Sequence, residues 1–178
     1  MNTERTLNEI ECALAQYFDI RRNIIVCNVS LGLLNHEADM VVLSPSGYLT
    51  EIEIKRSISD LRVDFKKEHD HSDKCLKYFY YCVPKALKDE CEKLINDNCR
   101  YVTAIITYDE KLSLSIEPVH YTHSGRDFIT AGREMGGRKL FLEEQLQIAR
   151  LGSMRACGLK NKQLENKNGS IELQSSRL

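Results

Sequence analysis

Short segments of the chain alternate apolar and polar residues or are rich in β-branched residues, and these patterns predict strands. The clearest cover 23–31, 37–43 and 48–55. Between the last two, the sequence SPSG at 44–47 has turn chemistry, because proline fixes φ and glycine tolerates a positive φ. Residues 37–55 are therefore predicted to form a β-hairpin.

Helical spacing of apolar residues predicts helices around these strands. The first covers 3–18, with Thr3 as its expected N-cap. A second begins at a cap on Ser57 or Ser59 and extends to about Lys77. Two further helices are predicted over 84–95 and 140–160, and three further strands over 77–84, 101–107 and 111–118.

The resulting order is α-β-β-β-α-β-α-β-β, which predicts an α/β fold with a central mixed β-sheet flanked by helices. Residues 1–118 are expected to form the core domain. Residues 119–160 are expected to form a loop followed by a C-terminal helical extension. The polar segment 161–178 is expected to be disordered.

Composition adds limits to this picture. The 178 residues have a formal net charge of -1, so a nucleic-acid partner would need a local basic patch. Seven cysteines occur without a CxxC pair, and the chain shows neither a leader-like start nor an apolar run of membrane-spanning length. We therefore expect a cytoplasmic protein with reduced thiols and no membrane partner.

The strand at 48–55 carries the first candidate chemistry. Because side chains alternate along a strand, Glu51, Glu53 and Lys55 share one face, while Ile52 and Ile54 share the other. This pattern alone fits a solvated edge strand as well as a functional site. The preceding predicted strand, 37–43, favours a functional site.

Asp39 begins a segment in which residues 40–43 are continuously apolar, as in a strand covered on both sides. A buried aspartate there is costly unless it is paired or binds a cation. A hairpin register in which paired residue numbers sum to 92 would place Asp39 opposite Glu53. Two carboxylates beside Lys55 suit metal-assisted hydrolysis of a phosphodiester, with Mg²⁺ as the expected ion and Mn²⁺ as a substitute.

Asp39 followed by Glu53-Ile54-Lys55 resembles the PD-(D/E)xK nuclease superfamily, and the similarity covers about residues 3–116. The longer stretch ADMVVLSPSGYLTEIEIKRSISDLRVDFKKEHD…YFYYCVP resembles the MmcB-like family of DNA-repair nucleases. The matching positions are Asp39, Glu53, Lys55, Ser57, Asp60, Asp64, Val83 and Pro84. The proline that usually precedes the first acid is replaced by Ala38, which does not remove a ligand.

The resemblance implies a restriction-endonuclease-like fold and a metal-dependent deoxyribonuclease acting in DNA repair or mobile-element DNA processing. Asp39 and Glu53 would bind the metal together with the backbone carbonyl of Ile54, and Lys55 would position the attacking water. The superfamily often adds a glutamate from the first helix. We select Glu11 over Glu4 and Glu9, because Glu11 borders the apolar stripe of that helix.

Several alternatives stay open. Glu37 and Glu51 share the face of Asp39 and Glu53, and either could bind a second metal or balance Lys55. A catalytically inactive DNA-binding module of the same fold is the main rival function, and a zinc-binding protein that uses His69, His71 and Cys75 is the third. DNA is the expected partner, with a homodimer as a further possibility. The expected DNA-binding residues are Arg56, Arg62, Lys66 and Lys67, and further basic residues lie in the extension.

Overall fold

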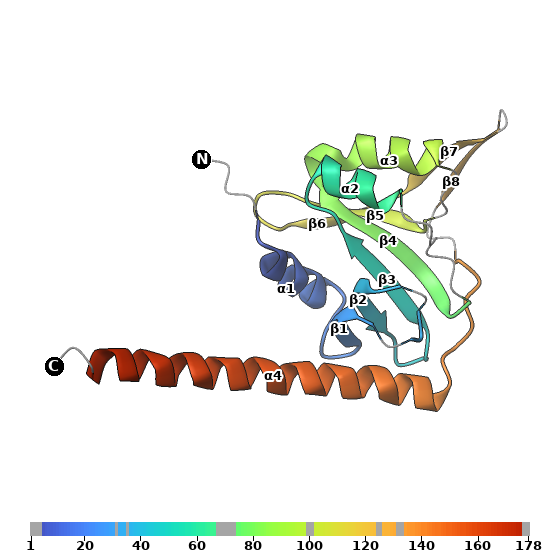
Figure 1. Cartoon of the computed structure of the whole chain (residues 1–178). Coiled ribbons are helices and arrows are strands. Elements are labelled where there is room, and N and C mark those ends of the chain that lie inside the picture. The colour runs from blue at the N-terminus through green and yellow to red at the C-terminus, as the bar shows by residue number, and fades with distance from the viewer. Residues whose placement is uncertain are drawn as a thin grey trace.

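A six-stranded mixed sheet is the centre of the computed structural model, which describes residues 5–30, 32–34, 36–66, 74–98, 102–123, 126–130 and 134–175 (Figure 1). The strands lie in the order β1-β2-β3-β4-β5-β6. The pairs β3–β4 and β4–β5 are parallel, and the other neighbours are antiparallel. Their bounds are β1 (Ile24–Val29), β2 (Ala38–Leu43), β3 (Leu49–Ile54), β4 (Leu76–Pro84), β5 (Ala104–Tyr108) and β6 (Leu114–Glu117).

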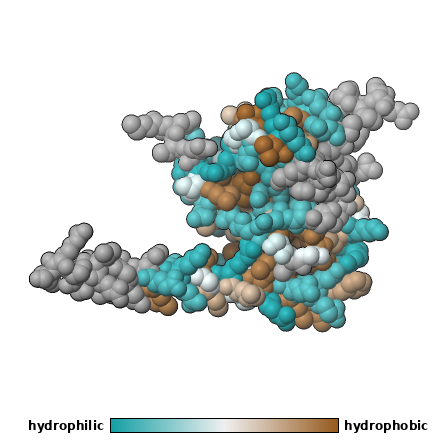
Figure 2. Space-filling view, in the orientation of Figure 1, coloured by the Kyte–Doolittle hydropathy of each residue, from teal (hydrophilic) through white to brown (hydrophobic). Residues whose placement is uncertain are grey.

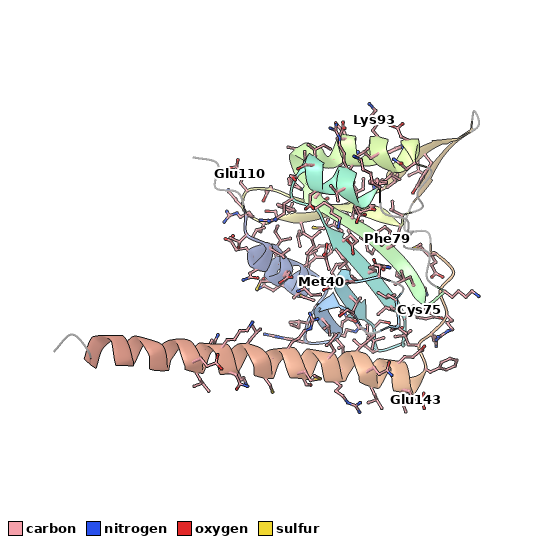
Figure 3. All side chains as sticks on the ribbon, viewed as in Figure 1. Met40, Cys75, Phe79, Lys93, Glu110 and Glu143 are labelled. Carbon is pink, nitrogen blue, oxygen red and sulfur yellow. The ribbon has the colours of Figure 1, made fainter. Side chains whose placement is uncertain are left out.

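Helices cover both faces of this sheet, as the sequence predicted. On one face, α1 (Leu7–Tyr17) packs Ile10 and Leu14 against an apolar cluster that includes Met40 and Ile52. On the other face, α2 (Ile58–Asp64) and α3 (Lys88–Asp97) cover a cluster around Phe79, and the first turns of α4 (Leu142–Ser175) cover a second one. Met40 and Phe79, one from each face, are labelled in Figure 3.

The N-termini of the first two helices show why they begin where they do. Thr6 caps α1 in a capping box with Glu9, whereas the predicted cap, Thr3, lies outside the described residues. Ser57 caps α2 by accepting the N–H of Asp60, which is one of the two predicted caps.

The second helix is shorter than predicted. It ends at Asp64, and Leu76 begins β4, so the expected helix to Lys77 is wrong at its C-terminal end. The reason is that 76–84 is dominated by aromatic and β-branched residues, which gain more from pairing in parallel with β3 than from extending a helix.

The segment after β6 is also more regular than predicted. Instead of a loop, it forms the hairpin β7 (Val119–His123) and β8 (Arg126–Thr130). Val119 and Tyr121 alternate into the cluster beneath α3, and the hydroxyl of Tyr121 accepts the backbone N–H of Val102 at 2.8 Å. This buried contact fixes a strand where the polar composition suggested a loop.

The last helix, α4, has 34 residues and continues to Ser175, through most of the segment for which disorder was predicted. Its first part is anchored by Ile148 in the cluster that contains Val26 and Val41. Beyond that anchor, residues 149–175 contain no proline that would end the helix, although they include several Gly, Asn and Ser residues. In Figure 1 the C-terminal part of α4 extends past the edge of the sheet. The coloured part of its surface in Figure 2 is mostly hydrophilic.

A search of the helices in the described ranges finds none that combines the length and the apolar character needed to cross a membrane. Helix α4 is long enough but carries charged residues throughout.

Candidate metal and hydrolytic site

The register of the β2–β3 hairpin places Asp39 beside Glu53. Met40 pairs with Ile52 and Val41 with Glu51, so the residue numbers sum to 92, which is the condition under which Asp39 and Glu53 meet. Backbone donors hold both acids: the N–H of Asp39 donates to Oε1 of Glu53 at 3.3 Å, and the N–H of Ile54 donates to Oδ2 of Asp39 at 2.8 Å. Both carboxylates are therefore oriented before any ligand binds.

Lys55 joins this pair from the end of β3. Its Nζ lies 2.5 Å from Oε2 of Glu53 and 3.5 Å from Oδ2 of Asp39. The side chains of Lys55 and Glu53 are buried, whereas that of Asp39 is 35% exposed, so the cluster opens to solvent on the side of Asp39. The structure thus brings together the three residues that the sequence motif had singled out.

The protonation state of Lys55 follows from its surroundings. Burial by itself lowers the pKa of an ammonium, but the carboxylates of Glu53, Asp39 and Asp64 together raise the pKa of Lys55 above its ordinary value. Lys55 is therefore a positively charged hydrogen-bond donor and not a free base at neutral pH.

Asp64 is a member of the cluster that was not among the predicted site residues, although the sequence allowed Asp60 or Asp64 to pair with Lys55 or Arg56. It projects from α2 into the buried face, where Oδ1 lies 3.3 Å from Nζ of Lys55 and Oδ2 accepts the hydroxyl proton of Tyr81 at 2.7 Å. A signal existed in the sequence, because Asp64 follows the buried Leu61 by three residues and so lies on the same helix face. Asp60, one turn earlier, is exposed.

Glu11 on α1 interacts electrostatically with one member of the cluster, Asp39. Burial raises the pKa of its carboxyl, and the neighbouring negative charge of Asp39 raises it further. Glu11 also interacts with Cys27 and Asn28 of β1, and with the guanidinium of Arg155 from α4. Of the other two candidates, Glu9 is used in the capping box of α1, and Glu4 lies outside the described residues.

Glu51 and Glu37, the two further acids on the same strand face, differ in placement. Glu51 is fully buried, and its Oε1 lies 2.7 Å from Nε2 of His36. Glu37 is exposed. Sequence reasoning did not select His36, because it lies in an irregular segment before β2 where no periodicity fixes the direction of its side chain.

Of the predicted DNA-binding residues, Arg56 follows β3 directly, Arg62 lies on α2, and Lys66 lies just after α2. Arg56 and Lys66 are exposed, and Arg62 is exposed and pairs with Glu90 at 3.0 Å. Lys67 lies outside the described residues. So do His69 and His71 of the alternative zinc group, whereas its third member, Cys75, is buried in the cluster under α4.

Comparisons with known proteins add little. No family model matches the chain, and no curated protein matches it. Among solved structures, the chain is similar to a protein of unknown function from Silicibacter pomeroyi, with a TM-score of 0.49 and 14% identity over 93% of this chain and 96% of the other. At this level of similarity the match carries no argument about function.

Proposed function

We propose that this chain is a metal-dependent nuclease that hydrolyses phosphodiester bonds in DNA. The observation that carries the proposal is the convergence of Asp39, Glu53 and Lys55, with Nζ of Lys55 within 3.5 Å of both carboxylates. The resemblance of the surrounding sequence to MmcB-like nucleases supports the same conclusion and suggests a role in DNA repair or mobile-element DNA processing.

The donor set fits a hard divalent cation such as Mg²⁺, with Mn²⁺ as a substitute, because its ligand atoms are oxygens. Asp39 and Glu53 would hold the ion together with the backbone carbonyl of Ile54. When bound, such an ion neutralises charge on the phosphate and makes water a stronger nucleophile. Glu11, which shares its electrostatic environment with Asp39, would complete the acidic side of the site.

Lys55 would supply the positively charged group of the proposed site. As a buried ammonium, it can orient the attacking water by hydrogen bonding and stabilise negative charge that develops on the phosphate. Asp64 and Tyr81 act behind it: the hydroxyl of Tyr81 fixes Asp64, and Asp64 fixes Lys55. Arg56, Arg62 and Lys66, exposed near this end of the sheet, together with Lys67, would contact the DNA backbone.

One observation favours the rival function, a DNA-binding module without turnover. Lys55 already pairs with three carboxylates, so the cluster has an internal cation that could replace a metal. In that case the ionic cluster would be structural, and the exposed basic residues alone would carry function.

The test uses the full chain, freed of metal and then supplied with Mg²⁺ or Mn²⁺, on single-stranded, duplex and branched DNA. Cleavage by the wild type that is lost in Asp39→Asn is the expected result. Salt-dependent binding without cleavage, unchanged in Asp39→Asn, would establish the binding module instead. Neither binding nor cleavage on any of the three substrates would exclude both functions.

A further inference from the structure

A second group of metal-binding side chains lies next to the cluster of Asp39 and Lys55. It consists of His36, Glu51 and Glu53, which offer one imidazole nitrogen and two carboxylate oxygens within 4.8 Å of one another. The side chains are 2%, 0% and 3% exposed, respectively. They come from the segment before β2 and from β3, so the hairpin itself brings them together.

We propose that His36, Glu51 and Glu53 form a binding site for a divalent transition-metal ion, separate from the site at Asp39. Two adjacent ligands of such an ion lie about 3 Å apart when each metal–ligand bond is about 2.1 Å. Nε2 of His36 and Oε1 of Glu51 are 2.7 Å apart, so a small movement suffices to coordinate an ion between them.

The ligand types determine which ions fit. Imidazole together with carboxylates suits Mn²⁺, Fe²⁺, Co²⁺ or Zn²⁺, whereas Mg²⁺ prefers oxygen ligands alone. The site at Asp39 has the reverse character, since its expected ligands are all oxygens. The two sites should therefore differ in selectivity even though they are neighbours.

The surroundings of Glu51 favour a cation on electrostatic grounds. Its partners on the neighbouring strands are Val41 and Phe79, which belong to the two apolar clusters on this face of the sheet. Glu51 and Glu53 thus place two carboxylates on one buried face, where like charges repel strongly. A cation bound between the two carboxylates would attract both of them and so offset their mutual repulsion.

Glu53 also links the two sites. Its Oε2 contacts Lys55, and its Oε1 accepts the backbone N–H of Asp39. A carboxylate with this placement can bridge neighbouring cations. The proposed site nevertheless does not depend on nuclease activity, because ion binding by His36 and Glu51 requires no DNA and no turnover.

The experiment is a titration of metal-free, full-length protein with Mn²⁺, followed by electron paramagnetic resonance. Pulsed measurements detect the magnetic coupling between Mn²⁺ and an imidazole nitrogen directly. We expect this coupling in the wild type and in His120→Gln, an exposed histidine that serves as the matched control. It should be lost in His36→Gln, and Glu51→Gln should weaken binding of the nitrogen-coupled ion at least tenfold.

Three results with the wild type and the His36 and Glu51 variants would overturn the proposal. The first is the absence of nitrogen coupling in the wild type at millimolar Mn²⁺, which needs no variant and means that His36 and Glu51 form only a hydrogen bond. The second is coupling that persists in His36→Gln, since another histidine would then be the ligand. If His36→Gln does not fold, unchanged binding of the nitrogen-coupled ion by folded Glu51→Gln decides the same question against the site.

Asp39→Asn separates this inference from the nuclease proposal. That variant should lose cleavage but keep the nitrogen-coupled Mn²⁺. Loss of the coupled ion in Asp39→Asn would mean that a single ion is shared, which would overturn the separate site. Nitrogen-coupled Mn²⁺ in a wild-type protein that cleaves no DNA would sustain the site while the nuclease proposal fails.

Discussion

The two faces of β3 are buried to the same extent but are built from opposite chemistry. Ile52 on one face and Glu51 on the other are both fully buried. Ile52 packs with Met40 and Ile106 beneath α1, in a cluster without charge. Glu51 and Glu53 face Phe79 and Tyr81 on β4 and carry carboxylates into a similar environment.

This difference shows that one face of β3 contributes to stability through apolar packing, whereas the other carries buried charge at a cost to stability. Burying an isoleucine stabilises the fold through the hydrophobic effect. Burying a carboxylate costs free energy that pairing only partly restores, and apolar replacements of buried ion pairs are often as stable. The two buried acids that contact Lys55, Glu53 and Asp64, therefore add little to stability, which is consistent with the site proposed above.

The largest expected effect concerns the apolar face. Ile52→Ala should lower the free energy of unfolding by about 3 kcal/mol, because it removes buried methyl groups and leaves a cavity. Denaturant unfolding measures this loss. The matched control is Ile116→Ala on β6, where the side chain is 42% exposed and the loss should stay below about 0.5 kcal/mol. Equal losses in the two variants would contradict the assignment of Ile52 to the core.

On the charged face, Lys55→Ala should reduce kcat for DNA cleavage about 100-fold or more, which corresponds to about 2.7 kcal/mol of transition-state stabilisation. Steady-state kinetics at saturating DNA measures it. Lys66→Ala, which changes an exposed residue just after α2, should instead weaken DNA binding and reduce its salt dependence at nearly unchanged kcat. If Lys55→Ala affected only binding, Lys55 would be a phosphate contact or a structural partner.

A smaller effect is expected from metal binding. Mg²⁺ at about tenfold above its Kd should stabilise the protein by about 1.4 kcal/mol, which raises Tm by roughly 3–6 °C in a chain of this size. Thermal unfolding with and without Mg²⁺, at matched ionic strength, gives the shift. Asp39→Asn should abolish it. An equal shift in wild type and Asp39→Asn would place the ion elsewhere.

The smallest expected effect on stability concerns Glu51, which precedes Ile52 and lies on the opposite face of β3. Glu51→Gln should change the free energy of unfolding of the metal-free protein by less than about 1 kcal/mol, because the amide oxygen still accepts a hydrogen bond from His36 while like-charge repulsion with Glu53 is removed. Denaturant unfolding beside Ile52→Ala makes the comparison direct. A loss as large as that of Ile52→Ala would show that Glu51 holds the fold.

The sequence was sufficient to group the parts of the site that lie on one hairpin. The turn at 44–47 predicted the hairpin, and the two-residue period placed Asp39 and Glu53 on one face, but the exact register that brings them together was only one of the options. The contribution of Asp64 depended on how α2 docks on the sheet. Helical spacing placed Asp64 on the buried face with Leu61 but did not show which group it would contact. The contribution of His36 depended on an irregular segment that has no periodicity.

The same distinction applies to the fold as a whole. The mixed sheet and its flanking helices could be predicted, because strong apolar patterns specify them. The hairpin β7–β8 and the full length of α4 could not, since the first depends on the burial of Val119 and Tyr121 beneath α3 and the second on docking of Ile148. Polar composition alone was a poor guide in both segments.

The contact between α4 and β1 affects the tendency of this protein to aggregate through its sheet edge. Strand β1 is an edge strand of the sheet. An edge strand has backbone N–H and C=O groups that can pair with another extended chain. The guanidinium of Arg155 donates to the carbonyls of Cys27 and Asn28 on this edge strand. Asn28 also has a positive φ of 54° and interrupts the strand pairing opposite Asp39. By occupying backbone acceptors on β1, helix α4 hinders the pairing of this edge with a strand of another copy, which would extend the sheet into aggregates.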